Sequence, residues 1–82
     1  MLFLIEYDRA KGTLEDFRTF QDSERQLAHD TRLELELALN EQGVQHEVVI
    51  LEAPSEQALR HTHGRYFKSL AELVGELATT PN

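Results

Sequence analysis

The segment from Asp22 to Gly43 limits the fold more than any other, because it is long and carries a helix signal at each end. Ser23 followed three residues later by Gln26 is a capping-box pattern, in which two side chains bond backbone N–H groups of the first turn. Gly43 suits the left-handed conformation that commonly closes a helix. The sequence therefore predicts one helix that spans roughly 28 Å at about 1.5 Å per residue, enough to cross a small domain.

The apolar residues of this helix fall on two faces. At about 100° per residue, one arc of about 120° forms the predicted core face. That arc contains Leu27, Ala28, Thr31, Leu35, Ala38 and Leu39. Leu33 and Leu37 lie on the opposite side, four residues apart and therefore stacked on each other.

Leu33 and Leu37 have three interpretations. They are individually exposed leucines, or a loop of the same chain covers them, or they contact a partner helix in a homodimer. Residues 33–37 also alternate like a half-buried strand, but leucine, glutamate and alanine favour a helix. We take Leu33 and Leu37 as candidate interface residues.

The length of 82 residues predicts a single domain, which we place at residues 1–78, followed by a flexible tail at residues 79–82. The core of so small a domain is marginal, so a second copy of the chain is a natural source of further buried surface. The chain has no cysteine, which excludes disulfides and cysteine-based metal sites. Absence of cysteine also fits a reducing compartment.

Charge and hydropathy narrow the possible partners. The longest apolar run, Met1 to Ile5, is too short for a membrane span or a signal-peptide core, so we expect a cytoplasmic protein and no membrane partner. A net charge of −7 argues against binding of nucleic acid or anionic lipid. Residues 57–71 are the exception, because they hold Arg60, Arg65 and Lys68 without any acid.

The first part of the chain predicts a β-hairpin. Leu2–Asp8 forms a strand that is apolar on both sides at its start, which indicates a central position in the sheet. Gly12 closes a turn, and Thr13–Gln21 returns as an antiparallel strand. We expect an irregularity near Asp16, a bulge that would bring Phe17 and Phe20 to the same side.

The remaining elements complete an α+β fold of order β-β-α-β-α(α). Val44–Glu52 is rich in β-branched residues and predicts a strand beside the first one. From Ser55 to residue 78 a helical pattern continues, either as one helix containing Gly64 or as two helices that meet there, and we expect a break near Gly64. A small sheet should thus pack against the long central helix and a helical C-terminal region.

The cationic segment is where a ligand site is most expected. Arginine guanidinium groups bind anions through two parallel hydrogen bonds, and glycine lets the backbone approach a ligand. The alternative is that these cations are solvated on one face of the helix or pair with acids of the long helix. The candidate anion-binding residues, for a phosphorylated or otherwise anionic small molecule, are Arg60, His61, Arg65, Tyr66 and Lys68.

The histidines carry no catalytic or metal-binding pattern. His61 and His63 are two apart and would point in different directions on an intact helix, with His61 facing solvent and His63 at the core boundary. They could bind one metal ion together only if Gly64 disrupts the helix before them. His46 and Glu47 are adjacent in a strand and should also point apart. We therefore predict no cofactor, no metal and no catalytic residue, and a non-enzymatic domain that self-associates or binds another protein; the alternative is a binder of, or weak enzyme on, a small anion.

Overall fold

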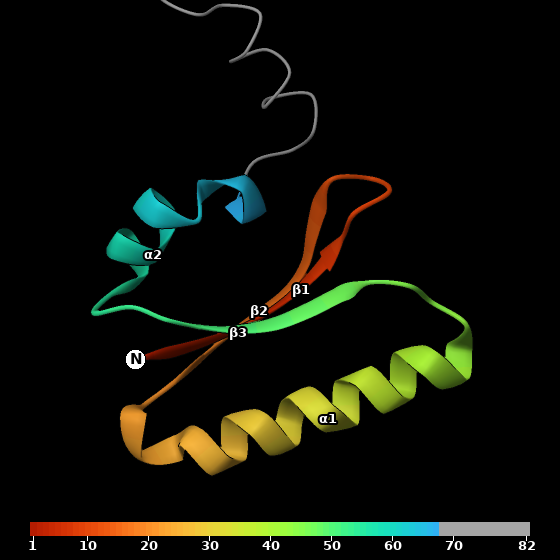
Figure 1. The fold of residues 1–82 in the computed structure, drawn as a ribbon, viewed down its shortest axis with the longest axis horizontal. Helices are drawn as coiled ribbons and strands as arrows, with labels where there is room; N and C mark the ends of the chain where they lie inside the picture. Colours follow the sequence, from red (N-terminus) through yellow and green to blue (C-terminus); the bar gives the residue numbers. More distant parts are fainter. Residues whose placement is uncertain (68–82) are drawn as a thin grey trace, which may run out of the picture.

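We describe residues 1–67 of a computed structural model of the chain. The elements in chain order confirm the α+β class and the order β-β-α-β-α (Figure 1). The strands are β1 (Leu2–Asp8), β2 (Thr13–Phe20) and β3 (Glu47–Glu52). The helices are α1 (Arg25–Gln42) and α2 (Glu56–Thr62), with short 3-10 turns η1 (Asp22–Glu24) and η2 (Gly64–Phe67).

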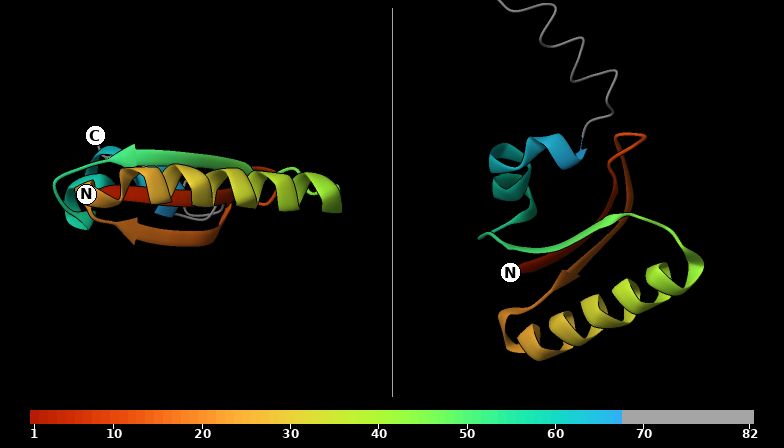
Figure 2. Two further views of the ribbon diagram at one scale, coloured as in Figure 1. Left: turned by 90° about the horizontal axis from the view of Figure 1, so that it is seen from below. Right: turned by 45° about the vertical axis from the view of Figure 1, so that its right-hand side comes forward.

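The three strands form one sheet in the order β2-β1-β3, and both outer strands run antiparallel to β1. This confirms the central position predicted for the first strand and the place of β3 beside it. Helix α1 covers one face of the sheet, while α2 and η2 cover the other (Figures 1 and 2). The described residues therefore build three layers, with the sheet in the middle.

Alternation along β1 explains why both faces of the sheet are covered. Successive side chains of a strand point to opposite faces, and β1 is apolar at odd and even positions alike. The α1 face holds a core cluster of Leu2, Leu4, Phe20, Ala28, Leu39 and Val48. The α2 face holds a second cluster of Phe3, Ile5, Tyr7, Leu59 and Tyr66.

Strand β2 contains the predicted irregularity. Asp16 lies opposite Glu6 and Leu14 lies opposite Tyr7, so Glu15 is the extra residue of a bulge. The predicted consequence was wrong, because Phe17 packs on the α2 face whereas Phe20 packs on the α1 face. The bulge instead brings Leu14 and Phe17, which are three residues apart, onto the same face.

The ends of α1 agree with the sequence only in part. The predicted capping box of Ser23 and Gln26 is wrong, because the chain enters the helix through η1, where the carboxylate of Glu24 accepts the backbone N–H of Gln21 at 2.8 Å. The Gly43 cap is confirmed. Its φ is 69°, and the N–H of Val44 donates to the carbonyl of Leu39 at 2.9 Å, which completes a Schellman-type closure.

The buried face of α1 is rotated by about 40° from the predicted arc. Ala28 and Leu39 are buried and Leu35 packs against them, as predicted, but Leu27 is 52% exposed and Ala38 is exposed. The reason is that α1 packs mainly on β3 and β1. The side of the helix that carries Leu27 and Ala38 lies outside this contact and remains in solvent.

The strand and the helix that follow α1 are shorter than predicted. Residues 44–46 form a loop, so β3 begins at Glu47 rather than at Val44. Ser55 caps α2 by accepting the N–H of Ala58 at 3.1 Å, and the helix ends at Thr62, which confirms a break near Gly64. The rest of the predicted helical region and the predicted tail lie outside the described residues.

Candidate functional site

The two arginines predicted to bind an anion are each paired with a carboxylate. The Nε atom of Arg60 lies 3.1 Å from Glu56 Oε2, and its guanidinium group stacks over the Phe67 ring at 4.3 Å. The Nη2 atom of Arg65 lies 3.3 Å from Glu47 Oε2. Such pairing favours the alternative in which the cations pair with acids, but these acids lie in α2 and β3 and not in the long helix as predicted.

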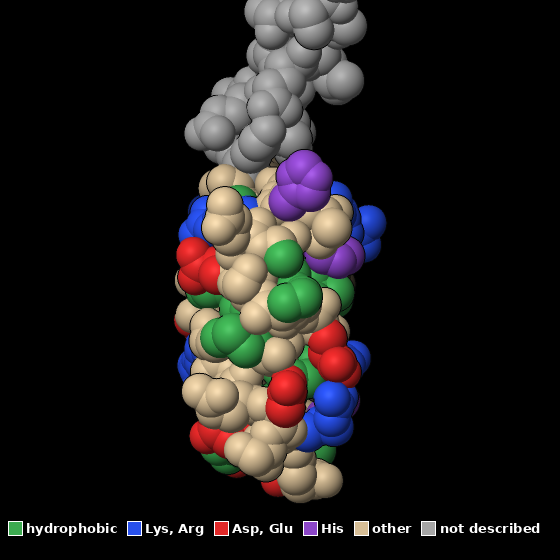
Figure 3. Space-filling view, turned by 90° about the vertical axis from the view of Figure 1, so that its left-hand side faces the viewer, with side chains coloured by type: hydrophobic (Ala, Val, Ile, Leu, Met, Phe, Trp, Pro, Cys, Tyr) green, Lys and Arg blue, Asp and Glu red, His purple; other side chains and the backbone are tan. Residues whose placement is uncertain are grey.

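Of the other members of the predicted anion site that the structure describes, Tyr66 lies against Arg65, whose Nη2 atom donates to its hydroxyl at 2.6 Å, whereas His61 does not join them. His61 is exposed on α2, as expected, and Lys68 lies outside the described residues. Figure 3 shows histidine side chains at the surface at the α2 end of the molecule, with acidic and cationic side chains interspersed below them. Tyr66 is buried in the core on the α2 face rather than available to a ligand.

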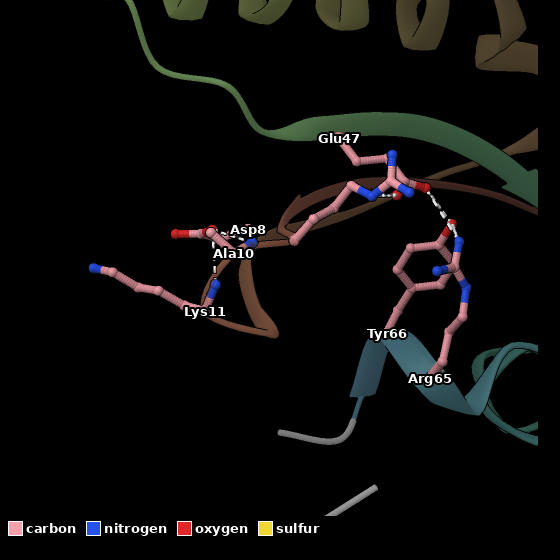
Figure 4. Close-up of polar contacts among 7 residues, drawn as sticks. Asp8, Ala10, Lys11, Glu47, Arg65 and Tyr66 are labelled. Carbon is pink, nitrogen blue, oxygen red and sulfur yellow. Dashed lines mark hydrogen bonds and ion pairs between the residues drawn. The ribbon is translucent and has the colours of Figure 1, made fainter. Parts of the chain in front are cut away.

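Glu47 is the acceptor around which Arg65 and Tyr66 are arranged (Figure 4). Its Oε2 atom accepts the hydroxyl of Tyr66 at 2.5 Å, and its Oε1 atom lies 3.6 Å from Arg9 Nε. Burial, together with the hydrogen bond to Glu47, raises the pKa of the Tyr66 hydroxyl. The Tyr66 hydroxyl donates to Glu47 and accepts from Arg65 Nη2 at 2.6 Å, and these contacts fasten η2 to the start of β3.

On the opposite face of the sheet, His46 lies between two carboxylates of β1. Its Nδ1 atom is 2.5 Å from Glu6 Oε2, and its Nε2 atom is 3.4 Å from Asp8 Oδ2. The three side chains are at most 16% exposed. The hydrogen bond to Glu6 raises the pKa of His46 against the opposing effect of burial, and the charge of Asp8 acts in the same direction as Glu6.

Asp8 connects this histidine to the hairpin turn. Its Oδ1 atom accepts the backbone N–H of Ala10 at 3.0 Å and of Lys11 at 3.1 Å (Figure 4). Its backbone carbonyl accepts the N–H of Gly12 at 2.7 Å. The hydrogen bond from Lys11, reinforced by that from Ala10, lowers the pKa of the Asp8 carboxyl. Gly12 has a φ of 68°, which glycine adopts without strain.

The contact of His46 with Glu6 and Asp8 could have been found from the pairing register of two strands, but not from residues that are neighbours in the sequence. His46 and Glu47 do point to opposite faces, as predicted, but His46 meets acids that are about forty residues away in the chain. Glu6 shares a face with Leu2 and Leu4, and it lies opposite Val48. Extending that antiparallel register by two residues places His46 opposite Asp8.

The contacts of its two ring nitrogens with Glu6 and Asp8 determine which reactions and ligands His46 can support. Both ring nitrogens face carboxylates, so the protonated imidazolium satisfies both acceptors and has no lone pair for a substrate or a metal. A shallow depression of about 510 Å³ adjoins the histidine and is lined by Arg9, Ala10, Gln45, His46 and Glu47. In the part of the chain that the structure describes, no group of three or more His, Cys, Asp or Glu side chains is arranged to hold a metal ion. The ion pairs of His46 with Glu6 and Asp8 therefore attach the loop before β3 to β1.

We expect the ion pairs of His46 with Glu6 and Asp8 to make the thermal stability of the protein depend on pH. Folding raises the pKa of His46, so protonated His46 stabilises the folded state. This stabilisation is complete below the ordinary histidine pKa near 6.5 and is lost as pH rises through the raised pKa. Asp8 acts in the opposite sense, because its lowered pKa stabilises the fold above about 3.8 and this is lost in acid. Melting temperatures of wild type and His46→Gln between about pH 5.5 and 9 test this. The difference between them should shrink as pH rises, and parallel curves would contradict the assignment.

The exposed leucines of α1 are the second notable surface. Leu33 is 57% exposed and Leu37 is 55% exposed, and they lie on the side of α1 turned away from the sheet. Among residues 1–67 no loop covers them. A hollow of about 190 Å³ adjoins Leu33 and is lined by His29, Arg32, Leu33 and Glu36. Positions i, i+3, i+4 and i+7 form the hole that receives a partner side chain in knobs-into-holes packing.

No protein-family model, curated protein or solved structure that we compared with this chain matches it. Among the described residues, no helix is both long and apolar enough to cross a membrane. The class that the structure defines is thus a small α+β domain with an antiparallel three-stranded sheet.

Proposed function

We propose that this chain is a small, non-enzymatic cytoplasmic domain whose role is to self-associate, and that α1 contributes to the contact between copies. The observation that carries the proposal is the pair Leu33 and Leu37, both more than half exposed on a helix whose other face is buried. Paired exposed leucines on a regular helix are typical of a protein contact surface.

A second copy is the partner that this surface fits best. It carries both a projecting apolar side chain, Leu33, and an adjoining hollow of the right spacing to receive one. A surface with knob and hole side by side is complementary to itself, as a twofold interface requires. The small size of the core adds a thermodynamic reason, because a dimer buries apolar surface that one copy cannot.

Sedimentation velocity over a range of concentrations tests the proposal. We expect the wild type to dimerise and Leu33→Glu/Leu37→Glu to dimerise at least about 100-fold more weakly, since it loses apolar burial and opposes like charges. Leu27→Glu is the matched control, because Leu27 is similarly exposed on the same helix but lies about 80–120° away from Leu37 and Leu33 around its axis. A wild type that stays monomeric, or a control that weakens association equally, would refute the proposal.

A further inference from the structure

Among residues 1–67, strand β3 lies at an edge of the sheet but has the composition of an interior strand. Its middle residues, 48–51, are Val-Val-Ile-Leu and contain no charge, no proline and no bulge. Val48 is buried, and the next three side chains are half-buried. Soluble proteins usually protect exposed sheet edges with charges, proline, bulges or very short strands.

Strand β2, the other edge of the sheet, shows the usual protection. It has a bulge at Glu15, and Glu15, Asp16 and Arg18 place charges along its length. The two edges of one sheet therefore differ, because β2 is built to stay unpaired whereas β3 is not. This contrast indicates that β3 has a partner.

The backbone of β3 can accept a further strand. Ala53 donates its N–H to the carbonyl of Met1 at 3.2 Å, which fixes the alternation of the ladder between β1 and β3. The odd-numbered residues of β3 therefore bond β1. Val48, Ile50 and Glu52 direct their N–H and C=O groups to the outer side, where no strand among residues 1–67 pairs with them.

The helices leave this edge accessible. Seen from the α1 side, the helix lies over the middle of the sheet, with β3 along one side and β2 along the other (Figure 2, left). In Figure 1 the sheet is seen from its edge, with α1 on one face and α2 on the other. The described helices thus cover the faces of the sheet and not the rim of β3.

We infer that two copies of the chain join through β3, in antiparallel orientation, to form one continuous sheet across the dimer. The inference rests on the proposed self-association and specifies its geometry. A register centred on Ile50 uses all three outward-facing residues, because Ile50 pairs with its own counterpart and Val48 pairs with Glu52 of the second copy. Parallel pairing in register would instead place Glu47 and Glu52 beside the same residues of the second copy, where like charges repel.

The same geometry explains the position of Leu33. Arg25 of α1 forms an ion pair with Glu52 of β3, so the flank of α1 that carries Arg25 faces the open edge. Leu33 and the hollow beside it lie towards that flank, at about 80° and about 30° from Arg25 around the helix. Joining the sheets puts both α1 helices on the same face, where these flanks approach each other across the joint.

Amide hydrogen exchange on the full chain tests the geometry with an internal control. In the dimer, the N–H groups of Val48, Ile50 and Glu52 should exchange as slowly as those of Val49 and Leu51, which are bonded to β1 in either state. Dilution below the dissociation constant should speed exchange at least tenfold at the even positions only. In a mixture of labelled and unlabelled protein, we expect nuclear Overhauser contacts between Ile50 residues of different copies.

The outcomes separate this inference from the proposed function. A chain that stays monomeric in sedimentation refutes both. A dimer whose even-numbered β3 amides exchange fast, or that gives no contact between copies at Ile50, refutes the β3 joint and leaves self-association in place. Slow exchange that does not depend on concentration would mean that residues 68–82 of the same chain cover the edge, which also overturns the inference.

Discussion

Replacing Phe3 by alanine should lower the free energy of unfolding by about 3–5 kcal/mol, the largest effect we expect from a single change. Phe3 is fully buried in β1, and its ring stacks on Phe17 with 5.7 Å between centroids. The substitution removes a large apolar side chain from the α2-side core and leaves a cavity that the central strand cannot close. A domain of this size has a total stability of about 4–12 kcal/mol, so the substitution removes at least about a quarter of it.

Urea denaturation followed by circular dichroism measures this effect. Leu27→Ala is the matched control, since it shortens an apolar side chain that is 52% exposed and should change the stability by no more than about 0.5 kcal/mol. A loss below about 1.5 kcal/mol for Phe3→Ala would show that the α2-side core is looser than the structure indicates.

Replacing Leu59 by alanine should cost about 2–5 kcal/mol. Leu59 is the buried residue of α2 and packs with Phe3, Ile5 and Tyr66, so it attaches the helical layer to the sheet. Because α2 is short, its own backbone hydrogen bonds do not hold it in place without this contact. We therefore expect the layer of α2 and η2 to loosen before the sheet unfolds.

The chain has two tyrosines and no tryptophan, which makes tyrosine emission a report on this layer. Tyr66 and Tyr7 pack edge to face with 5.3 Å between centroids, so detachment of η2 changes the surroundings of both rings. In Leu59→Ala the tyrosine transition should come at lower urea concentration than the circular dichroism transition. Gln57→Ala, an exposed change in the same helix, should leave the two transitions together, and a wild-type-like Leu59→Ala would disprove the anchoring role.

The elements were predictable from local patterns, but the choice of covered faces was not. The alternation in β1 places apolar residues on both faces, which is enough to identify a central strand. The arc of α1 could not be placed to within about 40°, because the covered part of a wide apolar arc depends on which strands the helix crosses. Leu27 is exposed for that reason.

The polar clusters required the register of the sheet. The pairing of β1 with β3 brings His46 to Glu6 and Asp8, and no spacing within either segment expresses that contact. The pairing of Arg65 with Glu47 likewise joins η2 to β3. Composition predicted a cationic segment correctly, but it could not show that Glu47, 18 residues before Arg65, pairs with that arginine. The pairing of Arg60 with Glu56 has the i, i+4 spacing of a helix and is local.

The place of β1 between two strands from different parts of the chain also sets the order of folding. The hairpin of β1 and β2 is local and can form within about 1–10 μs. Joining β3 to the other side of β1 requires closure of a loop that contains the whole of α1, which costs chain entropy before any contact repays it. We therefore expect β3 to arrive late, and the interval before it docks to be the time when the apolar first strand is most prone to aggregate.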